Sequence, residues 1–253
     1  MTAAHRKNAI CTLLKGIETG DPAAVAVVDE AKYIQHNPQT REGSEGLAHL
    51  FARLAKTNPR VNIVRIFADG DFVFGHTEYD FATRRIGFEV FRFEGDRAVE
   101  HWDNIQPRRG PNASSRSMVD GPTEPVDLEQ KEENRALVRS FVEDALIGRR
   151  RDLLPKFFDG DQLTQHSPEL EDGLPALIAA LDVSSGHSIA YQRVYRVLAE
   201  GSFARRVSGG TRDGDHSAFY DLFRVEDGKR AEHWDTVEHA APVSEWKNQN
   251  GKL

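Results

Sequence analysis

The chain has 253 residues, enough for two domains of ordinary size, and its 39% of hydrophobic residues can build real cores. Its formal net charge of -7 argues against a nucleic-acid partner, because a phosphate-binding surface needs a basic excess. The single cysteine, Cys11, excludes an internal disulfide and a cysteine-based metal site. Residues 1–10 lack the apolar core of a signal peptide, and the apolar run 23–28 is too short to span a bilayer. We therefore expect a cytoplasmic protein with no membrane partner, although export by another route stays open.

The first half of the chain predicts helices followed by strands. Ile10, Leu13, Leu14 and Ile17 lie at helical spacing, and Gly20 is expected to end that helix. A second helix is predicted over 23–33 and a third over 44–56. Four strands are then predicted, at 61–68, 72–79, 86–93 and 98–105, with turns between them. Three helices followed by an antiparallel meander indicate an α+β fold.

The same order of sequence blocks occurs twice. Gln-His-Asn-Pro at 35–38 returns as Gln-His-Ser-Pro at 165–168, an offset of 130. Glu-His-Trp-Asp at 100–103 returns at 232–235, an offset of 132. A two-copy repeat of this length predicts a domain duplication rather than a solenoid. The boundaries we expect are a first domain at 1–107, a poorly structured proline-rich linker at 108–127, a second domain at 128–243 and a tail at 244–253.

Strand alternation places polar groups on an apolar face. Glu89 shares a face with Phe91 and Phe93, which is informative because burial of an unpaired charge is costly. Asp103 lies on the corresponding face of the last strand. If these faces and that of His76 all point toward the helices, the three side chains could meet in one concavity, with His36 entering from the helix side.

The opposite face is also apolar, and it carries Phe88, Val90 and Trp102. A sheet with two apolar faces must be covered on both. Helices can cover one face. We expect a second sheet to cover the other, which predicts either an intramolecular pseudo-dimer of the two copies or a homo-oligomer.

The blocks at 33–38, 89–96 and 100–107 resemble SnoaL-like polyketide cyclases of the nuclear transport factor 2-like superfamily, close to the branch described as predicted aldol-condensation enzymes. The resemblance covers nearly all of both copies. It implies a cone-shaped pocket between a bent sheet and three helices, with an aspartate on the last strand as acid or base. Asp103 and Asp235 match that aspartate, and His36 and His166 match a pocket histidine.

The two copies depart from that pattern and from each other. Where the characterised cyclases tend to carry histidine, this chain has Glu89 and Asp221. His76 aligns with Val207, so the second copy lacks one candidate histidine. The full set of candidate catalytic residues comprises Asp103, His36, His76, Glu89, Asp235, His166 and Asp221.

Each candidate also has a structural interpretation. Asp103 and Asp235 could be strand-end carboxylates bonded to a neighbouring side chain, and His36 and His166 could bond the last carbonyls of a helix. Glu89 and Asp221 could pair with an arginine such as Arg65 or Arg196. His101 and His233 are expected to orient a neighbouring carboxylate, and Trp102 and Trp234 to be core or interface residues.

Cofactor and metal chemistry is not expected. His36, His76, Glu89 and Asp103 could form a mixed histidine-carboxylate site, but their spacing has no helical His-x-x-x-His pattern. A glycine-rich phosphate loop is missing between a strand and a helix, so no nucleotide cofactor is predicted.

Three functions remain open. The first is an enzyme in which Asp103 removes a proton next to a carbonyl of a small apolar substrate and a histidine stabilises the enolate, leading to aldol-type cyclisation, isomerisation or dehydration. The second is a non-catalytic module that binds a small apolar molecule or recruits a protein. The third is a mixed chain, in which the first copy catalyses and the second is its built-in structural partner.

Overall fold

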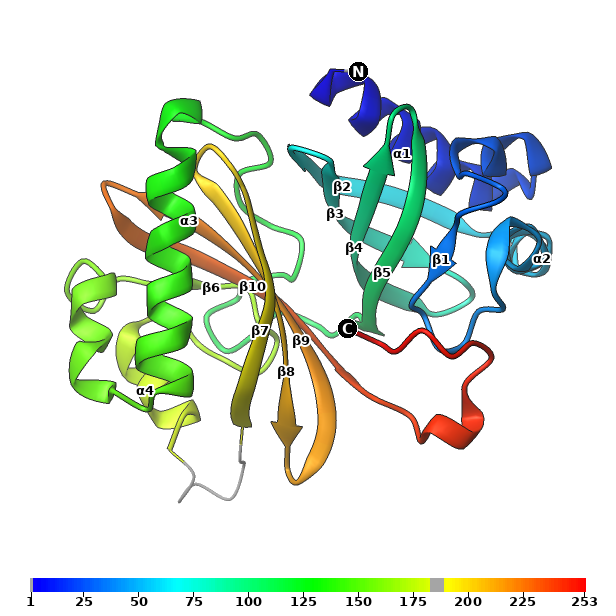
Figure 1. The fold of residues 1–253 in the computed structure, drawn as a ribbon. Helices are drawn as coiled ribbons and strands as arrows, with labels where there is room; N and C mark the ends of the chain where they lie inside the picture. Colours follow the sequence, from blue (N-terminus) through cyan, green and yellow to red (C-terminus); the bar gives the residue numbers. More distant parts are fainter. Residues whose placement is uncertain (1, 183–188) are drawn as a thin grey trace. The chain divides into compact units, whose positions relative to one another are not determined.

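The computed structural model describes residues 2–182 and 189–253, which form two compact α+β units (Figure 1). The described residues of the first unit are 2–108 and 241–253, and those of the second are 109–182 and 189–240. Each unit contains one five-stranded sheet with helices on one face. No helix in the described ranges is long and apolar enough to cross a membrane.

The first unit begins with α1 (Ala3–Thr19), whose apolar stripe packs on the sheet. Ile10, Leu13, Leu14 and Ile17 are all buried, as their spacing predicted. Gly20 ends the helix in the left-handed region at φ 67°, which glycine adopts without a Cβ penalty, and its N–H donates to the Gly16 carbonyl at 2.9 Å.

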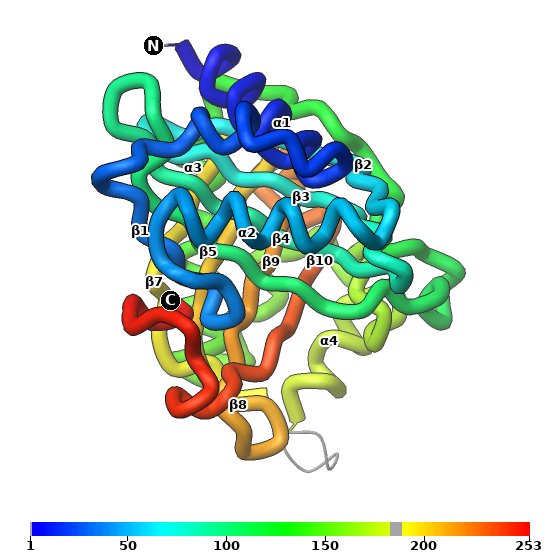
Figure 2. The backbone as a smooth tube through the Cα atoms, turned by 90° about the vertical axis from the view of Figure 1, so that its right-hand side faces the viewer, coloured from blue at the N-terminus to red at the C-terminus, as the bar shows by residue number. Residues whose placement is uncertain are grey.

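The predicted second helix is much shorter than expected. It is a 3-10 helix, Pro22–Val27, capped by the Asp21 side chain. Val28 then forms a parallel bridge with Ala98, and this sheet contact ends the helical segment. The third predicted helix is confirmed as α2 (Gly43–Ala55), and Figure 2 shows α1 and α2 lying over the strands of this unit.

The sheet of the first unit has the order β1-β5-β4-β3-β2. All four predicted strands are confirmed with slightly wider bounds, and β1 was not predicted. The β1 strand is parallel to β5, with Gln35 opposite His101. A register shift between Ile63 and Arg65 interrupts the pairing of β2 and β3, and such bulges bend a sheet. The strands are β1 (Ile34–Gln35), β2 (Arg60–Asp69), β3 (Phe72–Asp80), β4 (Arg84–Glu94) and β5 (Arg97–Pro107).

The second unit repeats this order, with the sheet β6-β10-β9-β8-β7. Its first helix, α3 (Lys131–Ser140), continues as a π-helical segment, Phe141–Ile147, and a 3-10 helix follows at Arg151–Phe157. The α4 helix spans Leu174–Ala180. The strands are β6 (Thr164–Gln165), β7 (Ile189–Glu200), β8 (Phe203–Arg212), β9 (Asp215–Glu226) and β10 (Lys229–His239).

The segments expected to be a loose linker and a free tail are instead integral parts of the units. The chain passes into the second unit after Arg108 and returns to the first unit after Ala240. We call residues 112–118 the linker strap, because they pack on the second unit. We call residues 247–252 the C-terminal strap, because they pack on the first.

Each strap has a buried asparagine that anchors it. In the linker strap, Asn112 Nδ2 donates to the carbonyls of Gln165 and Leu170, both at 2.7 Å. In the C-terminal strap, Asn248 Nδ2 donates to the carbonyls of Asn37 at 2.7 Å and Thr40 at 2.9 Å. Both side chains therefore satisfy carbonyl groups at the end of the short parallel strand or in the loop that follows it, and both asparagines are buried.

We expect Asn248→Ala to destabilise the first unit by about 1–3 kcal/mol, because it leaves buried carbonyl groups without their donor. Amide hydrogen exchange along β1 and β5 measures this loss. Asn112→Ala is the matched control and should weaken protection along β6 and β10 instead. Equal loss of protection in both units from either substitution would contradict the assignment of the straps.

Candidate functional site

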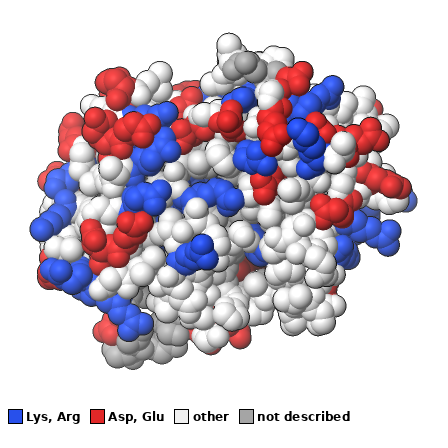
Figure 3. All heavy atoms as spheres, viewed as in Figure 1, with Lys and Arg blue, Asp and Glu red and all other residues white. Residues whose placement is uncertain are grey.

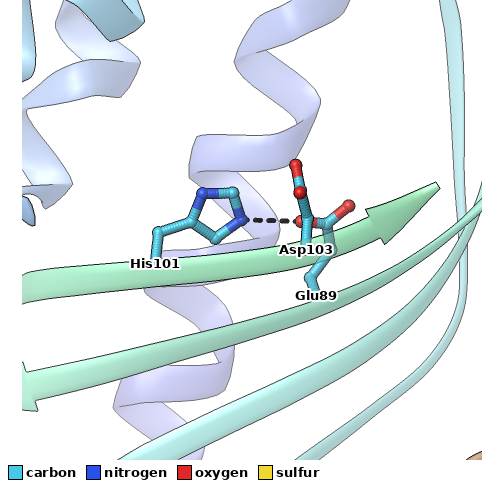
Figure 4. A group of neighbouring side chains, drawn as sticks. All are labelled: Glu89, His101 and Asp103. Atoms are coloured by element: carbon cyan, nitrogen blue, oxygen red, sulfur yellow. Dashed lines mark hydrogen bonds and ion pairs between the residues drawn. The ribbon is translucent and has the colours of Figure 1, made fainter. Parts of the chain in front are cut away.

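Two carboxylates meet on the helix-side face of the first sheet. Asp103 on β5 lies directly opposite Glu89 on β4. His101 lies two residues before Asp103 on β5 and faces the same side of the sheet (Figure 4). This neighbourhood was predicted from strand alternation. Glu89 is 2% exposed and Asp103 is 3% exposed, so each needs a partner inside the protein.

Glu89 is held by a histidine and a tyrosine rather than by an arginine. His101 Nε2 lies 2.7 Å from Glu89 Oε2, and the Tyr79 hydroxyl donates to Glu89 Oε1 at 2.8 Å. The Nδ1 of His101 lies 3.0 Å from Gln35 Oε1, which also accepts the Asn37 backbone N–H. Because Gln35 Oε1 is an acceptor, Nδ1 of His101 donates to it, and Nε2 faces Glu89. The expectation that Arg65 pairs with Glu89 was wrong, because Arg65 bonds His76 at 2.9 Å.

Asp103 forms a buried ion pair that the sequence did not predict. Lys252 Nζ in the C-terminal strap lies 3.2 Å from Asp103 Oδ1, and both side chains are 5% exposed. Asn37 Nδ2 donates to the other oxygen at 2.6 Å. Burial raises the pKa of Asp103, but the charges of Lys252 and His101 and the hydrogen bonds outweigh burial, so its pKa lies below the ordinary value. Asp103 is therefore a permanent carboxylate near neutral pH.

His36 and His76 do not join Asp103, contrary to expectation. The register pairs His76 with Phe88, on the face that carries Trp102 and turns away from the helices. Gln35 faces the helix side, so alternation along β1 directs His36 to the opposite face, where it stacks on Trp102 at 4.7 Å. Its ring nitrogens contact Glu100 Oε1 and the Gly251 carbonyl, each at 2.9 Å. His36 therefore connects the C-terminal strap to the sheet.

The side chains that could serve as metal ligands differ from the alternative set considered in the sequence. Glu89, His101 and Asp103 each offer a ligand atom, and these atoms lie within 4.8 Å of one another. Lys252 already forms an ion pair with Asp103, and His101 Nε2 already contacts Glu89 Oε2. The ligand atoms of this cluster thus already have side-chain partners, and we assign no metal to it.

The second unit has the same framework with different partners. Asp235 on β10 lies opposite Asp221 on β9. His233 Nε2 lies 2.9 Å from Asp221 Oδ1, and its Nδ1 lies 2.8 Å from Gln165 Oε1. His166 stacks on Trp234 at 4.5 Å and contacts Glu232 at 2.9 Å, so it lies on the other face, as His36 does.

A buried arginine distinguishes the second unit. Arg206 occupies the register position of Gly75 and donates from Nε to Asp221 Oδ2 at 2.9 Å. Burial raises the pKa of Asp221, but Arg206 and His233 outweigh it and bring the pKa to about 2. The expectation that Arg196 pairs with Asp221 was wrong. Arg196 on β7 lies opposite Val207 on β8, whereas Asp221 on β9 lies opposite Arg206.

The pKa of Asp235 is shifted in the opposite direction from that of Asp221. Burial and the negative charge of Asp221 raise its pKa to about 6, although His233 and a hydrogen bond from Ser167 Oγ at 3.2 Å act against this. Two neighbouring carboxyl groups with well-separated pKa values are the arrangement that enzymes use to divide acid-base roles. Asp221 stays ionised while Asp235 exchanges its proton near neutral pH.

Asp235 also reaches a cavity of about 640 Å³ within the second unit, a size typical of small-molecule sites. Ser167 lines it with Asp235, and most of the other lining residues are apolar. The apolar lining of this cavity comprises Ala113, Pro168, Leu170, Ala176, Ala179, Ala180, Ile189 and Val237.

Two cavities in the first unit do not include Asp103. One is lined by residues of α2 and the 3-10 helix, and the other is lined by the loop after β1 and by Lys247.

Residues 12–101 match the SnoaL-like domain family. The match lies in the first unit and ends two residues before Asp103. No curated protein matches the sequence.

Three similar solved structures each cover less than half of the chain. TsrD from Streptomyces laurentii is 18% identical, with a TM-score of 0.38, over 42% of this chain and 91% of its own. A candidate ketosteroid isomerase from Kribbella flavida is 21% identical, with a TM-score of 0.38, over 45% and 83%. An epoxide hydrolase of the LEH-like type from M. tuberculosis is 19% identical, with a TM-score of 0.36, over 41% and 84%.

Proposed function

We propose that the second unit is a cofactor-independent enzyme unit in which Asp235 moves a proton on the carbon next to a carbonyl group. The substrate would be small and mostly apolar, as the lining of the cavity suggests. The observation that carries the proposal is that Asp235 lines a cavity while its neighbour Asp221 is fixed as a carboxylate by Arg206. Proton removal is the step shared by aldol-type cyclisation, isomerisation and dehydration of carbonyl compounds.

The roles of the neighbouring groups follow from their contacts. Ser167 Oγ donates to Asp235 and holds the carboxyl group at the cavity. Burial, with a smaller contribution from the negative charge of Asp221, raises the pKa of Asp235, so Asp235 is a stronger base than an ordinary aspartate. Arg206 and His233 keep Asp221 ionised, and they therefore act on the reaction through Asp221.

Proton exchange tests this proposal without knowledge of the natural substrate. Cyclohexanone and 4-phenyl-2-butanone, incubated with the protein in D2O, report removal of α-protons by mass spectrometry. The intact chain should accelerate deuterium incorporation into at least one of these ketones, and Asp235→Asn should reduce the rate by at least 100-fold. Asp215→Asn removes an exposed carboxylate of β9 and serves as the control. Equal exchange by Asp235→Asn and the intact chain would contradict the proposed base.

The exchange rate should also depend on pH in one direction. Asp235 accepts a proton only when it is ionised, so the rate should rise as the pH passes through about 6 and level off above it. Measurement of the initial rate between pH 4.5 and 8 checks this expectation. A profile that stays flat from pH 5 to pH 7 would show that another group accepts the proton.

One observation favours a non-catalytic role for the first unit. The Asp103 carboxylate is buried and forms an ion pair with Lys252. A carboxylate with a lowered pKa is a poor base. We therefore keep the mixed-chain hypothesis but exchange the roles: the second copy catalyses, and the first copy is its structural partner.

A further inference from the structure

The two straps hold equivalent positions on the two units. Each has an asparagine that donates to loop carbonyl groups, as described above for Asn112 and Asn248. Each also has a backbone carbonyl at Nδ1 of a histidine, namely Ser117 at 3.0 Å from His166 and Gly251 at 2.9 Å from His36. These two contacts define the same strap position on each sheet.

The histidine that holds each strap is fixed in the same way. His36 and His166 stack on Trp102 and Trp234, and their Nε2 atoms contact Glu100 and Glu232 at 2.9 Å. Arginines complete the arrangement: Arg92 bonds Glu100 and Arg224 bonds Glu232, both at 2.7 Å. The strap position is therefore set by a matched framework, so the strap residues of the two units can be compared position by position.

The residue after the histidine-bound carbonyl is the one that differs in charge. It is Lys252 in the C-terminal strap and Met118 in the linker strap, and both are buried, at 5% and 2% exposure. Lys252 reaches Asp103. Methionine carries no charge that could pair with an aspartate.

We propose that this strap residue decides which unit can carry out proton transfer, and that the first unit contains a latent second site, closed by Lys252. The inference rests on the proposed function of Asp235. Lys252 places its ammonium on the carboxylate that corresponds to Asp235 and removes that group from proton exchange. The contacts of His101 with Gln35 and Glu89 match those of His233 with Gln165 and Asp221. Lys252 helps to lower the pKa of Asp103 against the effect of burial, which agrees with this view.

Lys252→Met, which copies the linker strap, tests the proposal in the full chain, and Lys252→Arg is its charge-preserving control. NMR titration of the Asp103 carboxyl carbon should show a midpoint at least one pH unit higher in Lys252→Met than in the intact chain, and little change in Lys252→Arg. A midpoint that does not move in Lys252→Met would overturn the proposal. Hydrogen exchange along β1 verifies that the strap and the unit remain folded.

Activity supplies the second readout. In the Asp235→Asn background, Lys252→Met should raise deuterium incorporation into the ketone probes by at least 10-fold, and Lys252→Arg should not. If the intact chain exchanges the probes and Asp235→Asn/Lys252→Met does not, the first unit holds no latent site and the proposal is wrong. If the intact chain exchanges no probe, the function proposed for Asp235 fails. The titration of Asp103 then still decides whether Lys252 controls that carboxylate.

Discussion

Replacement of Asp235 by asparagine is expected to abolish proton exchange and, at the same time, to stabilise the second unit at neutral pH. The pKa of Asp235, about 6, lies roughly two units above that of an ordinary aspartate. Holding this group ionised at pH 7 therefore costs roughly 2–3 kcal/mol of folding free energy. Asparagine has a similar shape and carries no charge, so the variant avoids most of this cost.

The sign of the pH dependence follows from the raised pKa. The folded state binds the proton of Asp235 more tightly than the unfolded state does. The stability of the intact second unit should therefore fall as the pH rises from about 4 to about 6, and then level off. The gain from Asp235→Asn should be near zero at pH 4 and reach its full size above pH 6. Hydrogen exchange along β9 and β10 measures it. A variant less stable than the intact chain at pH 7 would contradict the raised pKa.

Replacement of the matched residue in the first unit should have the opposite effect. Asp103→Asn leaves the buried ammonium of Lys252 without its carboxylate, which typically costs about 3–5 kcal/mol. The pKa of Asp103 is lowered, so its contribution to stability is present above about pH 4 and is lost at lower pH. We expect the loss of protection along β5 to be largest at neutral pH.

A double variant separates charge burial from packing. Asp103→Asn/Lys252→Met removes both charges and should recover most of the stability that Asp103→Asn loses, because paired charges can be exchanged for apolar groups at little cost. A loss below about 1 kcal/mol in the single variant, or no recovery in the double variant, would show that the ion pair does not hold the strap.

Local features of the fold could be predicted because they depend on near neighbours. The stripe of Ile10, Leu13, Leu14 and Ile17 predicted α1, and alternation placed Glu89 and Asp103 on one face. The second helix was predicted too long, because the contact of Val28 with Ala98 joins residues far apart in sequence. The pairing of outer sheet faces stays a prediction.

The site was harder to predict because its partners come from distant segments. The face of His76 depends on the register between β3 and β4, which alternation within one strand does not set. Lys252 lies 149 residues from Asp103 in the sequence, and no motif marks it. Arg206 carried a partial signal, since a buried arginine needs a partner, and a carboxylate on the neighbouring strand is one choice. Its partner, Asp221, had already been singled out.

The charged side chains of the surface differ from the buried charged groups of the two candidate sites. Acidic and basic side chains are interspersed on the face drawn in Figure 3, as the modest net charge of -7 suggests. The groups that distinguish the two units, Lys252 and Arg206, are both buried.

The most direct test of the account is an NMR titration of the carboxyl carbons of Asp103 and Asp235 in the intact chain. The two residues occupy the same position in the two sheets, so the comparison isolates the effect of their partners. The account predicts a midpoint near pH 6 for Asp235 and a midpoint below the ordinary value of 3.8 for Asp103. Equal midpoints, or a higher midpoint for Asp103, would contradict it.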